Sequence, residues 1–137
     1  MKLDHLGIAV RSLETAVNFY ENALGLRVCG YETIPQEKVR VAMLSLGSTR
    51  IELLEATAED SPIARFVAKH GEGLHHIAIE VDDLADHVRQ LRAAGARVIG
   101  NEQKTGAGGH HYVFIHPASA GGVLVELVEA AGEQRQP

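Results

Sequence analysis

The sequence is poor in cysteine, with Cys29 as the one cysteine among 137 residues. A disulfide within the chain is therefore excluded. A single thiol is typical of proteins kept in a reducing compartment, so we expect a cytoplasmic protein.

Long apolar runs and positive charge are also scarce. No run approaches the roughly 18 apolar residues that a membrane-spanning helix needs. The first segment, MKLDHLGIAV, carries an acid within a strand pattern and does not resemble a secretory signal. The net charge of −5 argues against nucleic acid or an anionic membrane as the main partner, because both are polyanions. We expect neither partner.

Hydrophobic residues, by contrast, make up 45% of the chain, which is enough for a core. The length suits one domain. We expect a single domain over about residues 1–130, followed by a loose tail over 131–137.

Two segments of the chain resemble each other. GLHHIAIEVDDL at 73–84 repeats the pattern of LDHLGIAVRSL at 3–13, which aligns His76 with His5. VELVE at 125–129 repeats IELLE at 51–55, which aligns Glu126 with Glu52. The sequence therefore predicts two copies of one structural unit.

Each copy has the same predicted order of elements, β-α-β-β-β. One helix is predicted to begin after Ser12 and end at Gly25, and the other to begin after Asp83 and end at Gly95. The apolar faces of these helices are Leu13, Val17, Tyr20 and Leu24 in the first copy and Leu84, Val88 and Leu91 in the second.

The predicted fold class is α+β, with a first module over about 1–58 and a second over about 73–130. A linking helix over about 61–71 is expected to begin at Ser61-Pro62. A module of about 60 residues could barely bury its own core, so we expect the two modules to lie side by side.

Side chains alternate between the two faces of a strand, which predicts the face on which each histidine lies. Leu6, Ile8 and Val10 should face the helix, so His5 faces the other way. The same alternation selects His76 and places its neighbour His75 on the opposite face. Small residues flank both selected histidines, which leaves room for a ligand.

Glu52 and Glu126 occupy equivalent positions in strands that otherwise resemble buried ones. Burying an unpaired carboxylate costs several kcal/mol, and a divalent metal would compensate it. His5, Glu52, His76 and Glu126 are therefore the predicted ligands of an octahedral divalent ion, with two positions left for water or substrate.

A structural role is the alternative for each of these residues taken singly. One histidine at a strand start is more often structural, and one glutamate near a strand end is usually solvated. Matching positions in two copies favour the metal site. The remaining histidines are predicted to be surface or structural residues.

Four stretches carry a family resemblance that covers almost the whole chain. They are GLHHIAIEVDD, DSPIARFVAKHGEG, KTGAGG and FIHPASAGGVLVELVE. The chain resembles the vicinal oxygen chelate superfamily, which includes glyoxalase I, extradiol dioxygenases and bleomycin-resistance proteins. Within it, the chain resembles most the methylmalonyl-CoA epimerase family.

The resemblance implies two βαβββ modules in tandem that form a cupped mixed β-sheet with helices on the outside. It implies an acyl-CoA substrate and a divalent metal, most often Co2+, with Zn2+, Mn2+, Ni2+ or Mg2+ as alternatives. It carries the ligand role onto His5, Glu52, His76 and Glu126. We also expect a homodimer.

The epimerase activity implied by the resemblance inverts C2 of methylmalonyl-CoA by removing a proton from one face and returning one to the other. Glu126 is the first candidate for this proton transfer, and Glu80, on the same predicted strand face as His76, is the second. Val41 stands where some epimerases carry a glutamate. Lys104 is a candidate anchor for the substrate carboxylate, and a solvated loop lysine is the alternative.

Other functions of the same fold stay open. A glyoxalase I-type lactoylglutathione lyase would use the same four ligands. A ring-cleaving dioxygenase usually has two histidines and one carboxylate, so Glu52 counts against it. A non-catalytic small-molecule-binding protein would lack these ligands and would carry more aromatic side chains than the six present here.

Overall fold

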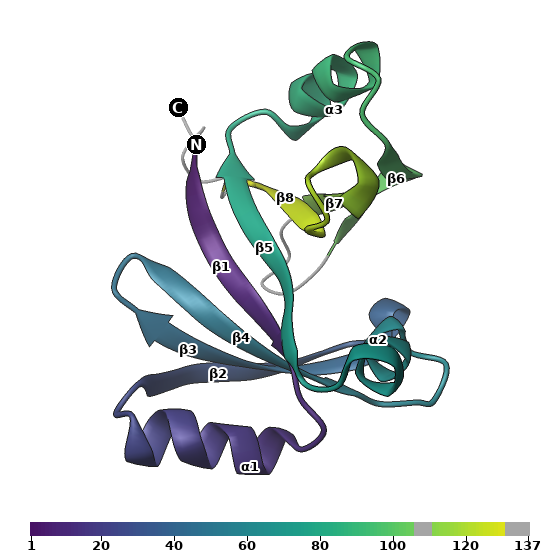
Figure 1. The fold of residues 1–137 in the computed structure, drawn as a ribbon. Coiled ribbons are helices and arrows are strands. Elements are labelled where there is room, and N and C mark those ends of the chain that lie inside the picture. Colours follow the sequence, from purple (N-terminus) through teal and green to yellow (C-terminus); the bar gives the residue numbers. More distant parts are fainter. Residues whose placement is uncertain (106–110, 131–137) are drawn as a thin grey trace. The chain divides into compact units, whose positions relative to one another are not determined.

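The computed structural model describes residues 1–105 and 111–130 (Figure 1). The chain divides into two compact units, one of residues 5–75 and one of residues 1–4 with the chain from His76 onward. The strands are β1 (Lys2–Ala9), β2 (Arg27–Ile34), β3 (Val39–Leu46), β4 (Thr49–Ala56), β5 (Gly73–Val81), β6 (Val98–Thr105), β7 (His111–Ile115) and β8 (Val125–Glu129).

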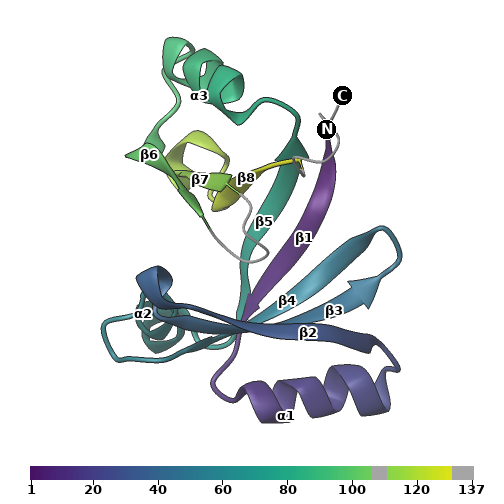
Figure 2. The same cartoon turned by 180° about the vertical axis from the view of Figure 1, so that it is seen from behind.

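The first unit contains four strands in the order β2-β3-β4-β1. Strand β1 runs parallel to β4, and the other neighbours are antiparallel. Helix α1 (Leu13–Val17) continues into the π-helix η1 (Asn18–Ala23) and lies along one face of β2, β3 and β4 (Figure 2). The core on this face buries Val10, Leu13, Val17, Ala42, Leu44, Ile51 and Leu53.

The opposite face of this half-sheet packs against α2 (Pro62–His70). Ser61 caps the helix by accepting a hydrogen bond from the Ile63 amide, and Pro62 occupies the first turn, where no intrahelical donor is needed. The second core of the unit buries Ala9, Val39, Val41, Leu54 and Ile63.

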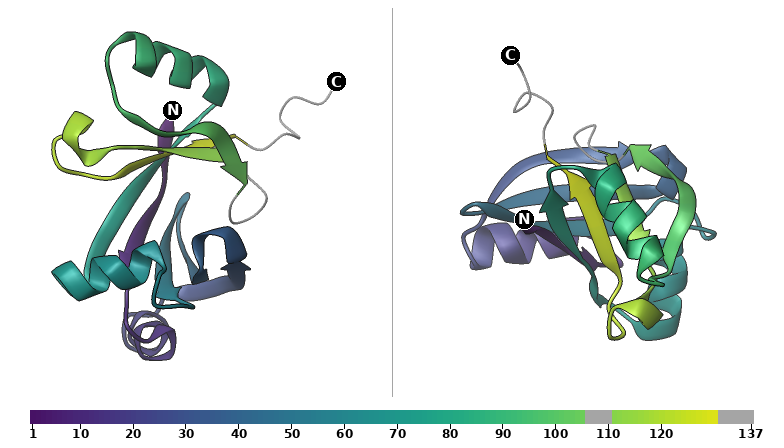
Figure 3. Two further views of the ribbon diagram at one scale, coloured as in Figure 1. Left: turned by 90° about the vertical axis from the view of Figure 1, so that its right-hand side faces the viewer. Right: turned by 90° about the horizontal axis from the view of Figure 1, so that it is seen from above.

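The second unit contains the strand order β5-β8-β7-β6, with β5 parallel to β8. Helix α3 (Leu84–Ala93) lies along one face of β6, β7 and β8 (Figure 3). Its core buries Val81, Leu84, Val113, Ile115 and Leu127. A smaller cluster on the other face contains Ala78, Tyr112 and Val128, with Phe114 packed against it.

The predicted fold class is confirmed. Each copy contributes a β-α-β-β-β succession, and both main helices begin at the predicted caps, where Ser12 and Asp83 accept amide hydrogen bonds. Gly95 has φ +85°, a conformation that glycine adopts without strain, and it follows the end of α3. In the described residues, no helix is long and apolar enough to cross a membrane.

The predicted buried face of the first helix is wrong at its C-terminal end. Leu24 was expected on the buried face of the first helix, but it is 57% exposed. From Asn18 onward the helix has π geometry, in which each amide bonds to the carbonyl five residues earlier. The wider turn breaks the 3.6-residue periodicity on which the prediction depends.

Candidate metal centre

His5 and Glu52 form a buried pair in the first unit. They come from the neighbouring parallel strands β1 and β4, in which Gly7 is the register partner of Glu52. The His5 Nδ1 atom lies 3.4 Å from Glu52 Oε2, and each side chain is only 5% exposed. The strands thus bring together two residues that are 47 positions apart in the sequence and that were predicted to be metal ligands.

Arg50 is a third member of this group, and it is not among the predicted site residues. Its Nη2 atom donates a hydrogen bond to Glu52 Oε2 over 2.8 Å, and its side chain is 34% exposed. Residues two apart on a strand share a face, so the alternation places Arg50 on the face of Glu52 but does not predict their contact. The charge of Glu52 therefore has a partner within the protein, and its burial does not by itself require a metal.

His76 and Glu126 form the corresponding pair in the second unit. The His76 Nε2 atom lies 3.1 Å from Glu126 Oε1, and the two side chains are 6% and 12% exposed. The Phe114 ring meets the His76 ring edge to face, with the ring centres 6.0 Å apart. The position equivalent to Arg50 is Leu124, so the second pair has no arginine at that position.

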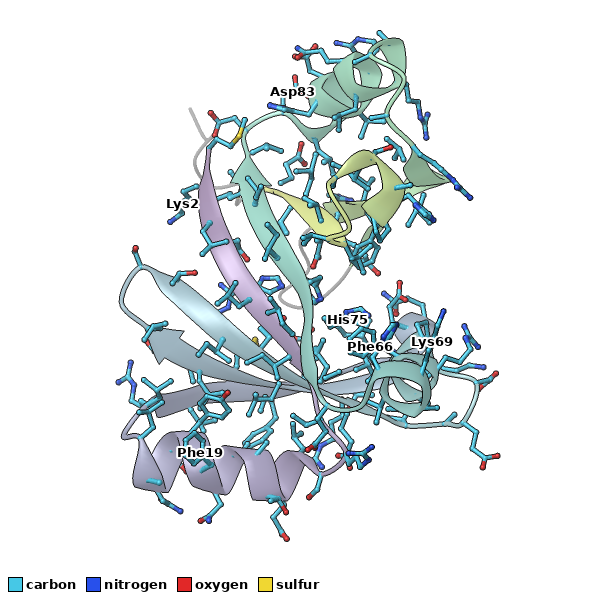
Figure 4. All side chains as sticks on the ribbon, viewed as in Figure 1. Lys2, Phe19, Phe66, Lys69, His75 and Asp83 are labelled. Atoms are coloured by element: carbon cyan, nitrogen blue, oxygen red, sulfur yellow. The ribbon has the colours of Figure 1, made fainter. Side chains whose placement is uncertain are left out.

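His75 has a different environment from His76, as the alternation predicts. Its ring meets Phe66 of α2 edge to face at a centroid distance of 4.9 Å, and the two labelled side chains lie together in Figure 4. His116 has a structural role, because its Nδ1 atom accepts a hydrogen bond from the Ala118 amide.

Of the other predicted site residues, Glu80 is described by the structure in full and Lys104 only in its backbone. Glu80 is half-buried on β5, opposite Val128 of β8, and shares a strand face with His76 and Ala78 by alternation. Lys104 belongs to β6, opposite Tyr112, but its side chain lies outside the described part of the chain. So does most of the glycine-rich stretch that follows it, at residues 106–110.

Val41 belongs to the apolar cluster beside α2 and is 1% exposed. Its register partner is Leu54, and the next residue of β3 on the same face, Met43, is the partner of Glu52. The position at which some epimerases carry an acid is therefore a packed apolar position in this protein.

A groove of about 340 Å³ lies elsewhere in the first unit. It is lined by one flank of α1 and η1 together with Tyr31 and Arg40. This is the face of the half-sheet that α1 covers, whereas Glu52 is on the opposite face. The groove is therefore separate from the His5–Glu52 pair.

The donor set fits a divalent metal. Each unit buries one imidazole beside one carboxylate, and mixed nitrogen and oxygen ligands suit several divalent ions. Burial of these groups beside each other also limits the water that could compete for the ligand atoms.

Comparison with known families identifies the superfamily of this chain. Residues 4–114 match the family described as the Glyoxalase/Bleomycin resistance protein/Dioxygenase superfamily. The chain belongs to this superfamily.

Curated members of the superfamily include close relatives of the chain. It is 44% identical over 130 residues to the mitochondrial methylmalonyl-CoA epimerase of Homo sapiens, covering 94% of this chain and 74% of the relative. It is also 44% identical to the ethylmalonyl-CoA/methylmalonyl-CoA epimerase of Cereibacter sphaeroides over 128 residues, covering 92% and 96% of the two chains.

A solved structure of the superfamily is similar to the chain over nearly its full length. A variant of the Streptomyces coelicolor methylmalonyl-CoA epimerase, in complex with 2-nitronate-propionyl-CoA, has a TM-score of 0.92 and 38% identity. The match covers 96% of each chain. The fold is thus the vicinal oxygen chelate fold that the sequence resemblance implies.

Proposed function

We propose that this protein is a metal-dependent epimerase that inverts C2 of methylmalonyl-CoA. The observation that carries the proposal is the recurrence of a buried histidine–glutamate pair at equivalent positions of the two repeats. The identity to methylmalonyl-CoA epimerases over more than nine tenths of the chain supports the substrate.

His5, Glu52, His76 and Glu126 are the proposed ligands of one divalent ion. The resemblance favours Co2+, and the mixed donor set is also compatible with Zn2+, Mn2+, Ni2+ or Mg2+. When bound, such an ion supplies Lewis-acid stabilisation of the negative charge that develops on the thioester oxygen.

The protein's own carboxylates carry the proton transfer in this proposal. C2 lies between a thioester carbonyl and a carboxylate, and inversion needs a proton acceptor on one face and a proton donor on the other. Glu126 is the proposed group on one face. Glu80, half-buried on the same strand face as His76, is the proposed second group. Lys104 is the proposed anchor for the substrate carboxylate.

The assembly and the compartment are further parts of the proposal. The family resemblance favours a homodimer, and the lone Cys29 favours a reducing compartment such as the cytoplasm.

Proton exchange at C2 tests the proposed reaction. Metal-loaded protein is incubated with one epimer of methylmalonyl-CoA in D2O, and mass spectrometry follows deuterium uptake while chiral analysis follows inversion. We expect both, because the group that delivers the new proton has equilibrated with solvent. The methylglyoxal–glutathione adduct serves as a parallel substrate, on which we expect no lyase activity.

Two variants test whether Glu126 carries out the proton transfer. Glu126→Gln should lower exchange and inversion by at least about 100-fold, the usual scale of general acid–base catalysis. Glu55→Gln, a half-buried strand glutamate outside the two pairs, is the matched control and should keep the rate. Fully metal-loaded protein that gives neither deuterium uptake nor inversion, and that turns over the glutathione adduct, would replace the epimerase with the lyase.

A further inference from the structure

One carboxylate oxygen in the first unit is shared by two side chains. Glu52 Oε2 accepts a hydrogen bond from Arg50 Nη2 over 2.8 Å and lies 3.4 Å from His5 Nδ1. The oxygen that the proposed function offers to a divalent ion is therefore already bound to a cationic guanidinium.

The second unit lacks this feature at the equivalent position. Glu126 lies beside His76 in the same way, but Leu124 replaces the arginine. The repeat has thus diverged at a position whose side chain contacts the buried carboxylate from the same strand. Leu124 cannot donate a hydrogen bond to Glu126 as Arg50 does to Glu52.

A guanidinium and a divalent ion compete for the same carboxylate. Hydrogen bonds between ionised groups are about twice as strong as neutral ones, and two positive charges at short range repel each other most where solvent is excluded. Glu52 is only 4% exposed and the Arg50 side chain is 34% exposed, so water screens this competition only in part.

We propose that Arg50 is a positioning residue that weakens the hold of Glu52 on the metal. It keeps the carboxylate oriented and compensated when no ion is bound, and it lowers the charge that Glu52 offers to an ion. This inference rests on the metal-ligand role of Glu52 in the proposed function.

Metal titration of the full chain tests the proposal. Calorimetric titration with Co2+ measures the dissociation constant of wild-type protein and of Arg50→Met and Arg50→Gln. We expect both variants to bind Co2+ about tenfold more tightly, a change of about 1.4 kcal/mol, and to unfold at a lower temperature without metal. Arg50→Lys keeps the charge and should keep the wild-type affinity.

The matched control is Arg40→Met, which removes the same charge from the opposite face of the half-sheet, the one that α1 covers. It should leave the affinity for Co2+ unchanged. A purely structural role of Arg50 predicts the opposite sign, because a loosened Glu52 would bind the ion less tightly.

The results separate this inference from the proposed function. Folded Arg50 variants whose affinity for Co2+ is unchanged or weaker would overturn the inference while the metal site stands. Wild-type protein that binds no divalent ion at all would overturn the proposed metal site, and the inference with it.

Discussion

Among single residues, the neighbours His75 and His76 differ in role, because only His76 belongs to the proposed site. His76 pairs with Glu126, whereas His75 packs against Phe66. We expect His76→Ala to lose most bound divalent metal and His75→Ala to keep it. Elemental analysis of the two purified variants after metal loading and dialysis measures the difference. Equal losses in both would show that the assignment of the strand faces is wrong.

A second prediction about a single residue concerns Val41. The resemblance alone suggests that Val41→Glu is tolerated, because some relatives carry a glutamate there. The structure predicts otherwise, since Val41 is 1% exposed within an apolar cluster. Burying an unpaired carboxylate should lower the free energy of unfolding by about 3 kcal/mol or more.

Urea denaturation measures that change. Arg40→Glu is the matched control, because it introduces the same side chain at the exposed neighbouring position of β3. We expect its effect to stay within about 1 kcal/mol. A stable Val41→Glu protein would mean that the cluster beside α2 opens readily to admit a charge.

The repeat explains which residues of the proposed site the sequence can identify. His5, Glu52, His76 and Glu126 were predictable because each has an equivalent in the other copy, and strand alternation then assigns their faces. Arg50 has no such equivalent, so comparing the copies does not identify it. Its contact with Glu52 depends on side-chain conformations, which the sequence pattern does not specify.

At the scale of secondary-structure elements, side-chain caps determine where the helices begin. Asp83 accepts a hydrogen bond from the Asp86 amide at the start of α3. Asp83→Ala should lower the free energy of unfolding by about 1 kcal/mol, because an amide at the helix start loses its acceptor. Asp83→Ser keeps an acceptor and should retain most of the stability. Thermal or urea unfolding of the three proteins measures the difference, and equal stability of all three would contradict it.

The ends of the helices were less predictable than their starts. Ser12 and Asp83 are local signals that the sequence displays directly, and both caps are present. The change from α to π geometry at Asn18 has no comparable local signal. A wider turn changes which side chains face the sheet, and so the exposure of Leu24 could not be read from a 3.6-residue pattern.

For the molecule as a whole, the repeat divides the proposed ligands equally between two units. Each unit has its own apolar core and its own buried histidine–glutamate pair. Two arrangements could follow from such a division. Either the four residues hold one ion, as we propose, or each pair holds its own ion.

Stoichiometry and thermal stability together distinguish these arrangements. An ion that binds only the folded protein stabilises it by about 2.7 kcal/mol at 100 times its dissociation constant, which corresponds to a rise of about 5–12 °C in the unfolding midpoint of a domain of this size. If one ion uses all four ligands, wild-type protein binds one ion per chain, and either His5→Ala or His76→Ala alone removes most of the bound metal and most of the rise. If each pair binds its own ion, wild-type protein binds two ions, and each variant keeps one of them with part of the stabilisation. We expect the first result, because a single imidazole and a single carboxylate leave most of the coordination positions of a divalent ion to water and hold it weakly.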